Sequence, residues 1–229
     1  MKGFLIFLAM GAAIGLSLWR GWWSVPPAWN PWAPLDIAQA PNFLTSFKLG
    51  RLGDDPALCE QVLATSSLRY QPLADSPGTA QCPLHNTVRV QGSQLRLSSS
   101  FVASCPLAVA FAMFERHALQ PAAQAVFAEE VTQVDHLGSF ACRNIYNRQN
   151  ARRSQHASAN ALDIAGFRLA DGRRINVLND WPKNDDASRF LHLVRDGACK
   201  SFKTVLGPDY NAAHHNHLHL DMGPWTVCR

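Results

Sequence analysis

The sequence predicts an α+β fold, in which a small antiparallel sheet has helices packed around it and an N-terminal transmembrane helix precedes the domain. Three observations lead to this prediction. Polar and apolar residues alternate through 216–222 and partly through 161–167, as in half-buried strands. The stretches 106–117 and 187–202 have the composition and apolar spacing of core-packed helices, and residues 3–19 carry no charge.

The first element is the apolar segment at 1–23, which we interpret as a membrane anchor or signal segment. Its uncharged run approaches the ~20 residues that span a bilayer, and Arg20 can extend its charge to the interface. Trp19, Trp22 and Trp23 are suited to the membrane interface. No small-residue cleavage site follows the run, which favours a retained anchor over a removed signal peptide.

A Pro/Trp-rich stretch at 24–40 follows and is predicted to be a tether. The remaining segment, 41–229, is long enough for one domain with a hydrophobic core, and 47% of the chain is hydrophobic. The net charge of +4 is too small to indicate a nucleic-acid partner, and no aromatic and basic array is present.

The helix at 106–117 can begin with Pro106 at its first position, where a missing N–H costs nothing. The helix at 187–202 contains Gly197, which weakens the prediction for its last turn. The other predicted elements are a helix at 57–65, two short strands within 87–98 that turn at Gly92 and Ser93, and a short helix at 121–127.

The six cysteines all follow the tether, and none forms a Cys-x-x-Cys motif. An even number scattered in this way predicts three disulfides in an oxidising compartment, whereas a metal–thiolate site is disfavoured because His and Asp residues already supply ligands. Six cysteines allow fifteen pairings. The pairing we expect is Cys59 with Cys82, Cys142 with Cys199, and Cys105 with Cys228.

The residues that most constrain function are His156, Asp163, His217 and His219. A catalytic zinc ion takes three ligands of His and carboxylate type and leaves a fourth position open. On a straight helix, His156 and Asp163 would lie roughly 10 Å apart, too far to share a metal. We therefore expect a turn between them, with His156 in a loop or short helical turn and Asp163 on a strand.

On a strand, His217, His219 and Asp221 would share one face, with the two imidazoles roughly 7 Å apart. That spacing suits a metal ligand and a neighbouring base. Asp221 either orients a ligand histidine or is an ordinary exposed residue, and both interpretations stay open. His214 and His215, in the preceding loop, are expected to face solvent or to support the ligands from outside.

A half-buried strand with a wet polar face would also alternate in this way, but two separated His/Asp clusters favour a metal site. Other hydrolytic schemes find no support, because the chain has no His-Glu-x-x-His, no Gly-x-Ser-x-Gly and no Gly-rich phosphate loop. The prediction is therefore metal-assisted hydrolysis, or metal binding without turnover, with Zn²⁺ as the expected cofactor.

These motifs carry a family resemblance. The chain from Ser139 onward resembles the bacterial extensin-like C-terminal domain family, and weaker similarity extends to about Leu58. The pattern Ser-x-His followed by Ala-x-Asp and His-x-His is similar to lysostaphin, D-Ala-D-Ala peptidase and hedgehog-type zinc metallopeptidases. The matching stretches are 141–143, 154–156, 160–167, 205–214 and 217–221. The proline-rich repeats of plant extensins are absent, so composition does not support a wall-scaffold role.

The resemblance implies a zinc ion held by His156, Asp163 and His219, with His217 beside it as base or oxyanion stabiliser. It also implies an arginine over the site. Arg143 is the preferred catalytic candidate, while Arg148 and Arg153 remain alternatives.

One departure concerns Ala159, which stands where the peptidase pattern usually has glycine, and this places substrate fit in question more than metal binding. The implied function is a zinc metallopeptidase, an endopeptidase or carboxypeptidase, that cleaves peptidoglycan peptides in the cell wall. The implied location is the periplasm, with the inner membrane as a partner through the N-terminal helix, or an otherwise exported state. The alternatives are a non-catalytic wall-binding domain in which the same residues hold a structural metal or none, and an exported, disulfide-braced domain with a vestigial site.

Overall fold

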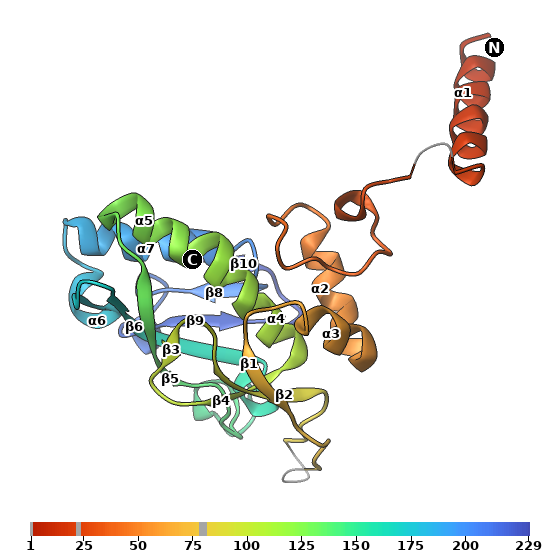
Figure 1. Ribbon diagram of the computed structural model, residues 1–229. Helices are drawn as coiled ribbons and strands as arrows, with labels where there is room; N and C mark the ends of the chain where they lie inside the picture. The colour runs from red at the N-terminus through yellow and green to blue at the C-terminus, as the bar shows by residue number, and fades with distance from the viewer. Residues whose placement is uncertain (1, 22–23, 78–81) are drawn as a thin grey trace.

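The computed structural model describes residues 2–21, 24–77 and 82–229, apart from the side chains of Lys2 and Leu18 (Figure 1). The domain is α+β, with a seven-stranded and a three-stranded sheet. The large sheet has the order β10-β8-β9-β6-β5-β3, with β7 paired to β6, and the small sheet has the order β1-β2-β4. The strands are β1 Arg69–Pro72, β2 Thr87–Gly92, β3 Arg96–Leu97, β4 Phe101–Ser104, β5 Val131–Gly138, β6 Ala161–Leu169, β7 Arg174–Asn176, β8 Thr204–Leu206, β9 Leu218–Asp221 and β10 Val227–Cys228.

The helices gather on one side of the large sheet, where α5 and α7 lie together and α4 runs toward the small sheet (Figure 1). The short helices α2 and α3 pack against α4. The helices are α1 Lys2–Trp19, η1 Pro27–Trp29, α2 Thr45–Asp54, α3 Pro56–Leu63, α4 Cys105–Phe114, η2 Glu115–Leu119, α5 Gln120–Phe127, η3 Ile145–Asn147, η4 Gln155–Ser158, α6 Val177–Asp180, α7 Asp186–Ala198 and η5 Ala212–His214.

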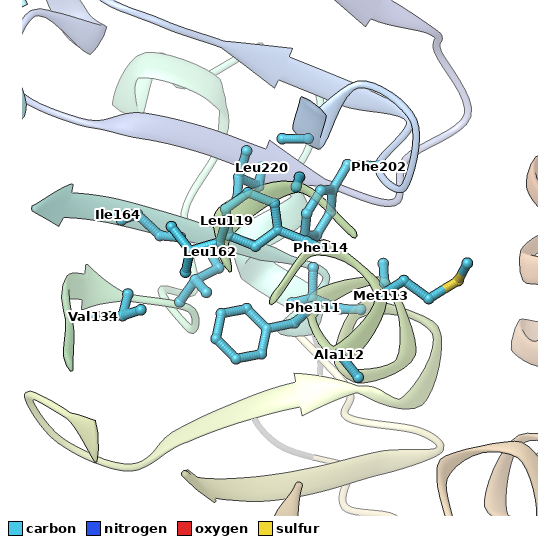
Figure 2. Close-up of a cluster of buried hydrophobic side chains, with 14 of the residues drawn as sticks. Phe111, Ala112, Met113, Phe114, Leu119, Val134, Leu162, Ile164, Phe202 and Leu220 are labelled. Carbon is cyan, nitrogen blue, oxygen red and sulfur yellow. The ribbon is translucent and has the colours of Figure 1, made fainter. Parts of the chain in front are cut away.

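Helix α4 lies at the centre of the core. Every residue from Cys105 to Phe114 is buried, which explains why this helix is apolar all round instead of amphipathic. Leu162, Ile164 and Leu220 of the large sheet belong to the same apolar cluster as α4 (Figure 2). Because successive strand residues face opposite sides, the side chains between these leucines and isoleucine face away from the helices.

The prediction of one small antiparallel sheet is wrong, because the large sheet is mixed and has seven strands. The strand pairs β3–β5 and β8–β10 are parallel, and a second sheet is present. The two strands predicted within 87–98 exist, but they do not form a hairpin. Strand β2 pairs with β1 and β4, while β3 joins the large sheet beside β5. Gly92 has φ +146°, and the chain leaves the small sheet there instead of turning back.

The helices predicted at 106–117 and 121–127 form one continuous helical stretch from α4 through η2 to α5. The π-helical η2 lies directly before Pro121, whose missing N–H and bulky ring disfavour a regular α-helical bond. The predicted helices at 57–65 and 187–202 are confirmed as α3 and α7, although α7 ends at Ala198.

The predicted transmembrane helix is not supported. Among the described residues, no helix combines the length and the apolarity needed to cross a membrane. Helix α1 spans 18 residues. It lies away from the rest of the molecule (Figure 1). Trp22 and Trp23, which we expected at a membrane interface, lie outside the described residues.

The Pro/Trp-rich stretch predicted as a tether packs on the domain. Leu35 and Ile37 are buried in the core, and the Ile37 carbonyl lies 2.8 Å from His117 Nε2. Lys48 donates a hydrogen bond to the Pro27 carbonyl at 2.7 Å. These contacts hold the segment between η1 and α2 against the helical layer.

The three predicted disulfides are present, but all three expected pairings are wrong. The bonds join Cys59 to Cys105, Cys82 to Cys142, and Cys199 to Cys228. Pairing depends on which cysteines the tertiary fold brings within reach, and sequence spacing does not reveal this. Three disulfides with no free cysteine among the described residues indicate an extracytoplasmic domain.

Gly197 is required for close packing between α7 and η2. A Cβ atom at this position would lie 2.6 Å from the Cβ of Ala118. We expect Gly197→Ala to lower the free energy of unfolding by about 1–3 kcal/mol, despite the better helix propensity of alanine. The matched control is Gly50→Ala in α2, where a Cβ meets nothing within 4 Å. Urea unfolding should show the control at or above wild-type stability; a Gly197→Ala variant equally stable would contradict the packing argument.

Candidate metal centre

Strands β6 and β9 place two of the predicted ligands opposite each other. Asp163 pairs directly with His219 across the antiparallel ladder, and Ala161 pairs with Asp221. Asp163, His219 and Asp221 therefore occupy the sheet face that points away from α4. The predicted strand positions of Asp163 and His219 are confirmed, whereas His217 lies just before β9 begins.

A tight turn brings His156 to the same face. His156 lies in the 3₁₀ helix η4, as expected for a short helical turn, and Ser154 caps that helix by accepting the His156 N–H. The helix ends at Ala159 in the left-handed region, with φ +53°. A left-handed alanine costs about 1 kcal/mol, whereas glycine would adopt this backbone freely.

Three donor residues, His156, Asp163 and His219, converge, with one ligand atom of each within 4.8 Å of the others. His156 Nε2 lies 3.3 Å from His219 Nδ1 and 3.2 Å from Asp163 Oδ2. His219 Nδ1 lies 2.9 Å from Asp163 Oδ1. Donors bound to one zinc ion at about 2.0–2.2 Å in tetrahedral geometry are separated by about 3.3–3.5 Å. The three side chains are close enough to share one ion, with His156 facing Oδ2 of Asp163 and His219 facing Oδ1.

Hydrogen bonds behind the donors fix their orientation. His156 Nδ1 donates to the Ser139 carbonyl at 3.0 Å, which leaves Nε2 facing the cluster. His219 Nε2 donates to Asp221 Oδ2 at 3.0 Å, and Asp221 Oδ1 accepts the Gly223 N–H at 2.7 Å. Asp221 thus holds the His219 ring, the first of the two interpretations left open by the sequence.

Charges within the cluster shift two pKa values in opposite directions. Burial opposes ionisation of Asp163, but hydrogen bonds and charge from His156 and His219 outweigh it and hold the pKa of Asp163 well below its usual range. Burial disfavours the charged form of His219, but Asp163 and Asp221 outweigh it and raise the pKa of His219 to about 9. Before a metal binds, His219 is therefore a cation between two carboxylates.

His217 lies beside the three donors, with Nε2 3.5 Å from Asp163 Oδ1. Its Nδ1 donates to Asn216 Oδ1 at 2.8 Å, so Nε2 is the nitrogen left to accept a proton. Burial lowers the pKa of His217, and the neighbouring charges of His219 and His156 lower it further against the opposing effect of Asp163. His217 is thus neutral at neutral pH.

His214 is closer to the cluster than its loop position suggested. It is buried, and its ring centroid lies 5.3 Å from that of His217 and 5.6 Å from that of His219. Burial and the charges of His219 and His217 lower the pKa of His214 to about 4. His214 therefore supports the cluster as a neutral imidazole, whereas His215 is exposed. The sequence feature that could have indicated His214 as part of the cluster is the presence of four histidines within six residues.

The cluster opens into a pocket of about 490 Å³. Two of the three candidate arginines, Arg143 and Arg153, line the pocket. The third, Arg148, lies over the Tyr146 ring at 5.6 Å and does not line it. Arg143 is partly buried. Three aromatic residues that no sequence motif indicated also line the pocket: Tyr146, Tyr210 and Trp225.

A family profile described as "Extensin-like protein C-terminus" matches residues 57–229. The chain belongs to the extensin-like C-terminal family. The match covers the resemblance from Ser139 onward and confirms the weaker similarity expected back to about Leu58, from α3 through both sheets to the C-terminus. No curated protein and no solved structure matches the chain significantly.

Metal binding to this extensin-like domain is expected to depend on pH. Because the pKa of His219 is raised to about 9, a zinc ion must displace a proton from it at neutral pH. Zinc affinity should therefore rise about tenfold per pH unit between pH 6.5 and 8.5. Competition with a chelator of known proton affinity measures the slope, and calorimetry in two buffers counts the released protons. A flat profile would contradict a protonated His219.

Proposed function

We propose that this extensin-like domain is a zinc-dependent hydrolase that cleaves peptide bonds of bacterial cell-wall peptidoglycan. The observation that supports the proposal is the convergence of His156, Asp163 and His219, with one ligand atom of each within 4.8 Å of the others, in an open pocket and with the free nitrogen of His217 beside them. Three protein ligands leave a fourth position for water or substrate, as in catalytic zinc sites.

Bound zinc supplies a Lewis acid that activates water and polarises a carbonyl group. The protein holds the ion through one carboxylate and two imidazoles whose remaining N–H groups are already committed to Ser139 and Asp221. These commitments fix the ring planes, so the donor atoms need not reorganise when the metal binds.

We assign the transfer of the proton to His217. Its Nε2 atom accepts a proton from water and returns it to the leaving amine, because Nδ1 is occupied by Asn216. The lowered pKa of His217 keeps this nitrogen unprotonated at neutral pH. A peptide bond and one water molecule then yield a carboxylate and an amine.

Arg143 is assigned the stabilisation of negative charge on the carbonyl oxygen. It lines the pocket and forms no ion pair with any described residue, so its charge is not neutralised within the protein. The likeness of the motif to wall-cleaving metallopeptidases and the extracytoplasmic location supported by the disulfides favour wall peptides as substrates.

The test is digestion of purified wall sacculi by the full-length protein, with and without a chelator, followed by mass spectrometry of the released fragments. The proposal expects fragments that differ by hydrolysis of one type of peptide bond, lost on chelation and restored by zinc. Zinc bound stoichiometrically without any cleavage would favour the alternative, a wall-binding domain with a structural metal. Absence of zinc by elemental analysis would contradict the hydrolase and favour a domain with a vestigial site.

A further inference from the structure

Arg152 and Trp225 form a second feature of the pocket that the proposed chemistry does not use. The Arg152 guanidinium carbon lies 5.4 Å from the centroid of the Trp225 ring, and both residues line the pocket that contains the donor cluster. We propose that this pair binds a carboxylate of the substrate, so that the domain selects anionic peptides. The inference rests on the proposed function in taking the substrate to be a wall peptide.

The backbone holds both members of the pair in place. The Arg152 carbonyl accepts the Ile145 N–H at 2.9 Å, and the next pair along the loop joins Ser154 to Arg143 at 3.1 Å. The Trp225 carbonyl accepts a hydrogen bond from the Thr204 hydroxyl at 3.0 Å. The two side chains therefore meet from anchored segments, which reduces the entropy lost when a ligand binds.

The charges around the pocket favour an anion. The acidic residues among its described lining are Asp163 and Asp221, and both are hydrogen-bonded to His219. Arg152 forms no ion pair with any described residue. Positive charge at the rim is therefore not cancelled by a protein carboxylate.

A stacked arginine suits a carboxylate through its geometry and not only through its charge. A guanidinium that lies over an aromatic ring keeps its plane fixed and presents its N–H groups at the edge, where a carboxylate can accept two parallel hydrogen bonds. Trp225 is 60% exposed, so its ring is accessible as a platform at the mouth of the pocket.

The experiment measures peptide binding to full-length protein from which metal has been removed with a chelator, so that hydrolysis does not interfere. The probes are the stem tetrapeptide Ala-Glu-Lys-Ala and its versions amidated at the glutamate side chain, at the C-terminus or at both. Calorimetry should show that amidation at one of these positions weakens binding by about tenfold for the wild type and has no effect on Arg152→Gln. The two single amides identify which carboxylate is bound.

The matched control is Arg174→Gln, because Arg174 is exposed on β7 and does not line the pocket. It should retain the wild-type preference. Trp225→Leu should reduce the preference through the loss of support for Arg152, and the Trp225→Leu/Arg152→Gln double variant should be no weaker than Arg152→Gln alone. A folding defect is checked by thermal unfolding of each variant.

Equal binding of all four peptides by the wild type, or an unchanged carboxylate preference in Arg152→Gln, would overturn the proposal. Failure of the subsite and failure of hydrolysis are distinguishable. If the charge preference is present but sacculi are not cut, the subsite stands and the hydrolase assignment falls. If sacculi are cut but the preference is absent, the reverse holds.

Discussion

Asp163→Asn is expected to abolish stoichiometric zinc binding. The substitution keeps the size of the side chain but removes the negative charge among the three donors, and the amide nitrogen cannot serve as a ligand. The loss should exceed the ~10- to 100-fold that removal of a residue supporting a ligand costs. Elemental analysis after dialysis and competition with a chromophoric chelator measure the effect.

The matched control is Asp221→Asn, which leaves all three donors in place but removes the acceptor of the His219 Nε2–H. We expect its zinc affinity to fall only about 10- to 100-fold. Circular dichroism separates loss of metal from loss of fold. One tightly bound zinc per chain in Asp163→Asn would show that the metal is held elsewhere.

His217→Ala is expected to retain zinc and fold but to lower the rate of fragment release from sacculi by about 10²- to 10⁴-fold. The reason is that His217 is adjacent to the donors without being one of them, and its free Nε2 is the proton acceptor of the proposed reaction. The rate is measured with zinc-loaded protein at saturating sacculi, so that weaker substrate binding does not enter.

The control for this experiment is His215→Ala. His215 is two residues away and exposed, and its Nδ1 is bonded to the Ala212 carbonyl outside the cluster. It should cut sacculi at the wild-type rate. A His217→Ala enzyme as active as this control would remove the proton-transfer role and turn attention to His214, the other neutral imidazole at the site.

The parts of the fold that the sequence predicts are those specified by neighbouring residues. The alternation in β6 and β9 records which side of the sheet faces α4, so the positions of Asp163 and His219 on strands were predictable. The buried helix α4 was predictable from its continuous apolar composition. The turn that brings His156 to Asp163 was predictable because a straight helix would have kept them apart.

The parts that could not be predicted depend on contacts between distant segments. The separation of β2 and β3 into different sheets requires knowledge of β1 and β5. The burial of His214 depends on the loop around Asn211, which accepts its Nδ1–H at 2.8 Å. The same holds for Trp225, which contacts Arg152 across 73 positions of the chain only after the tail has folded back.

Two of the three disulfides lie next to the pocket in the chain, whereas none joins the residues of the donor cluster. Cys142 immediately precedes Arg143, and Cys228 closes the tail that carries Trp225, so two of the bonds fasten segments that line the pocket. The donor cluster depends instead on strand pairing and on η4. A chain whose cysteines are still thiols would thus keep the strand pairing that positions the donor cluster, while the segments that carry Arg143 and Trp225 become fastened only on oxidation.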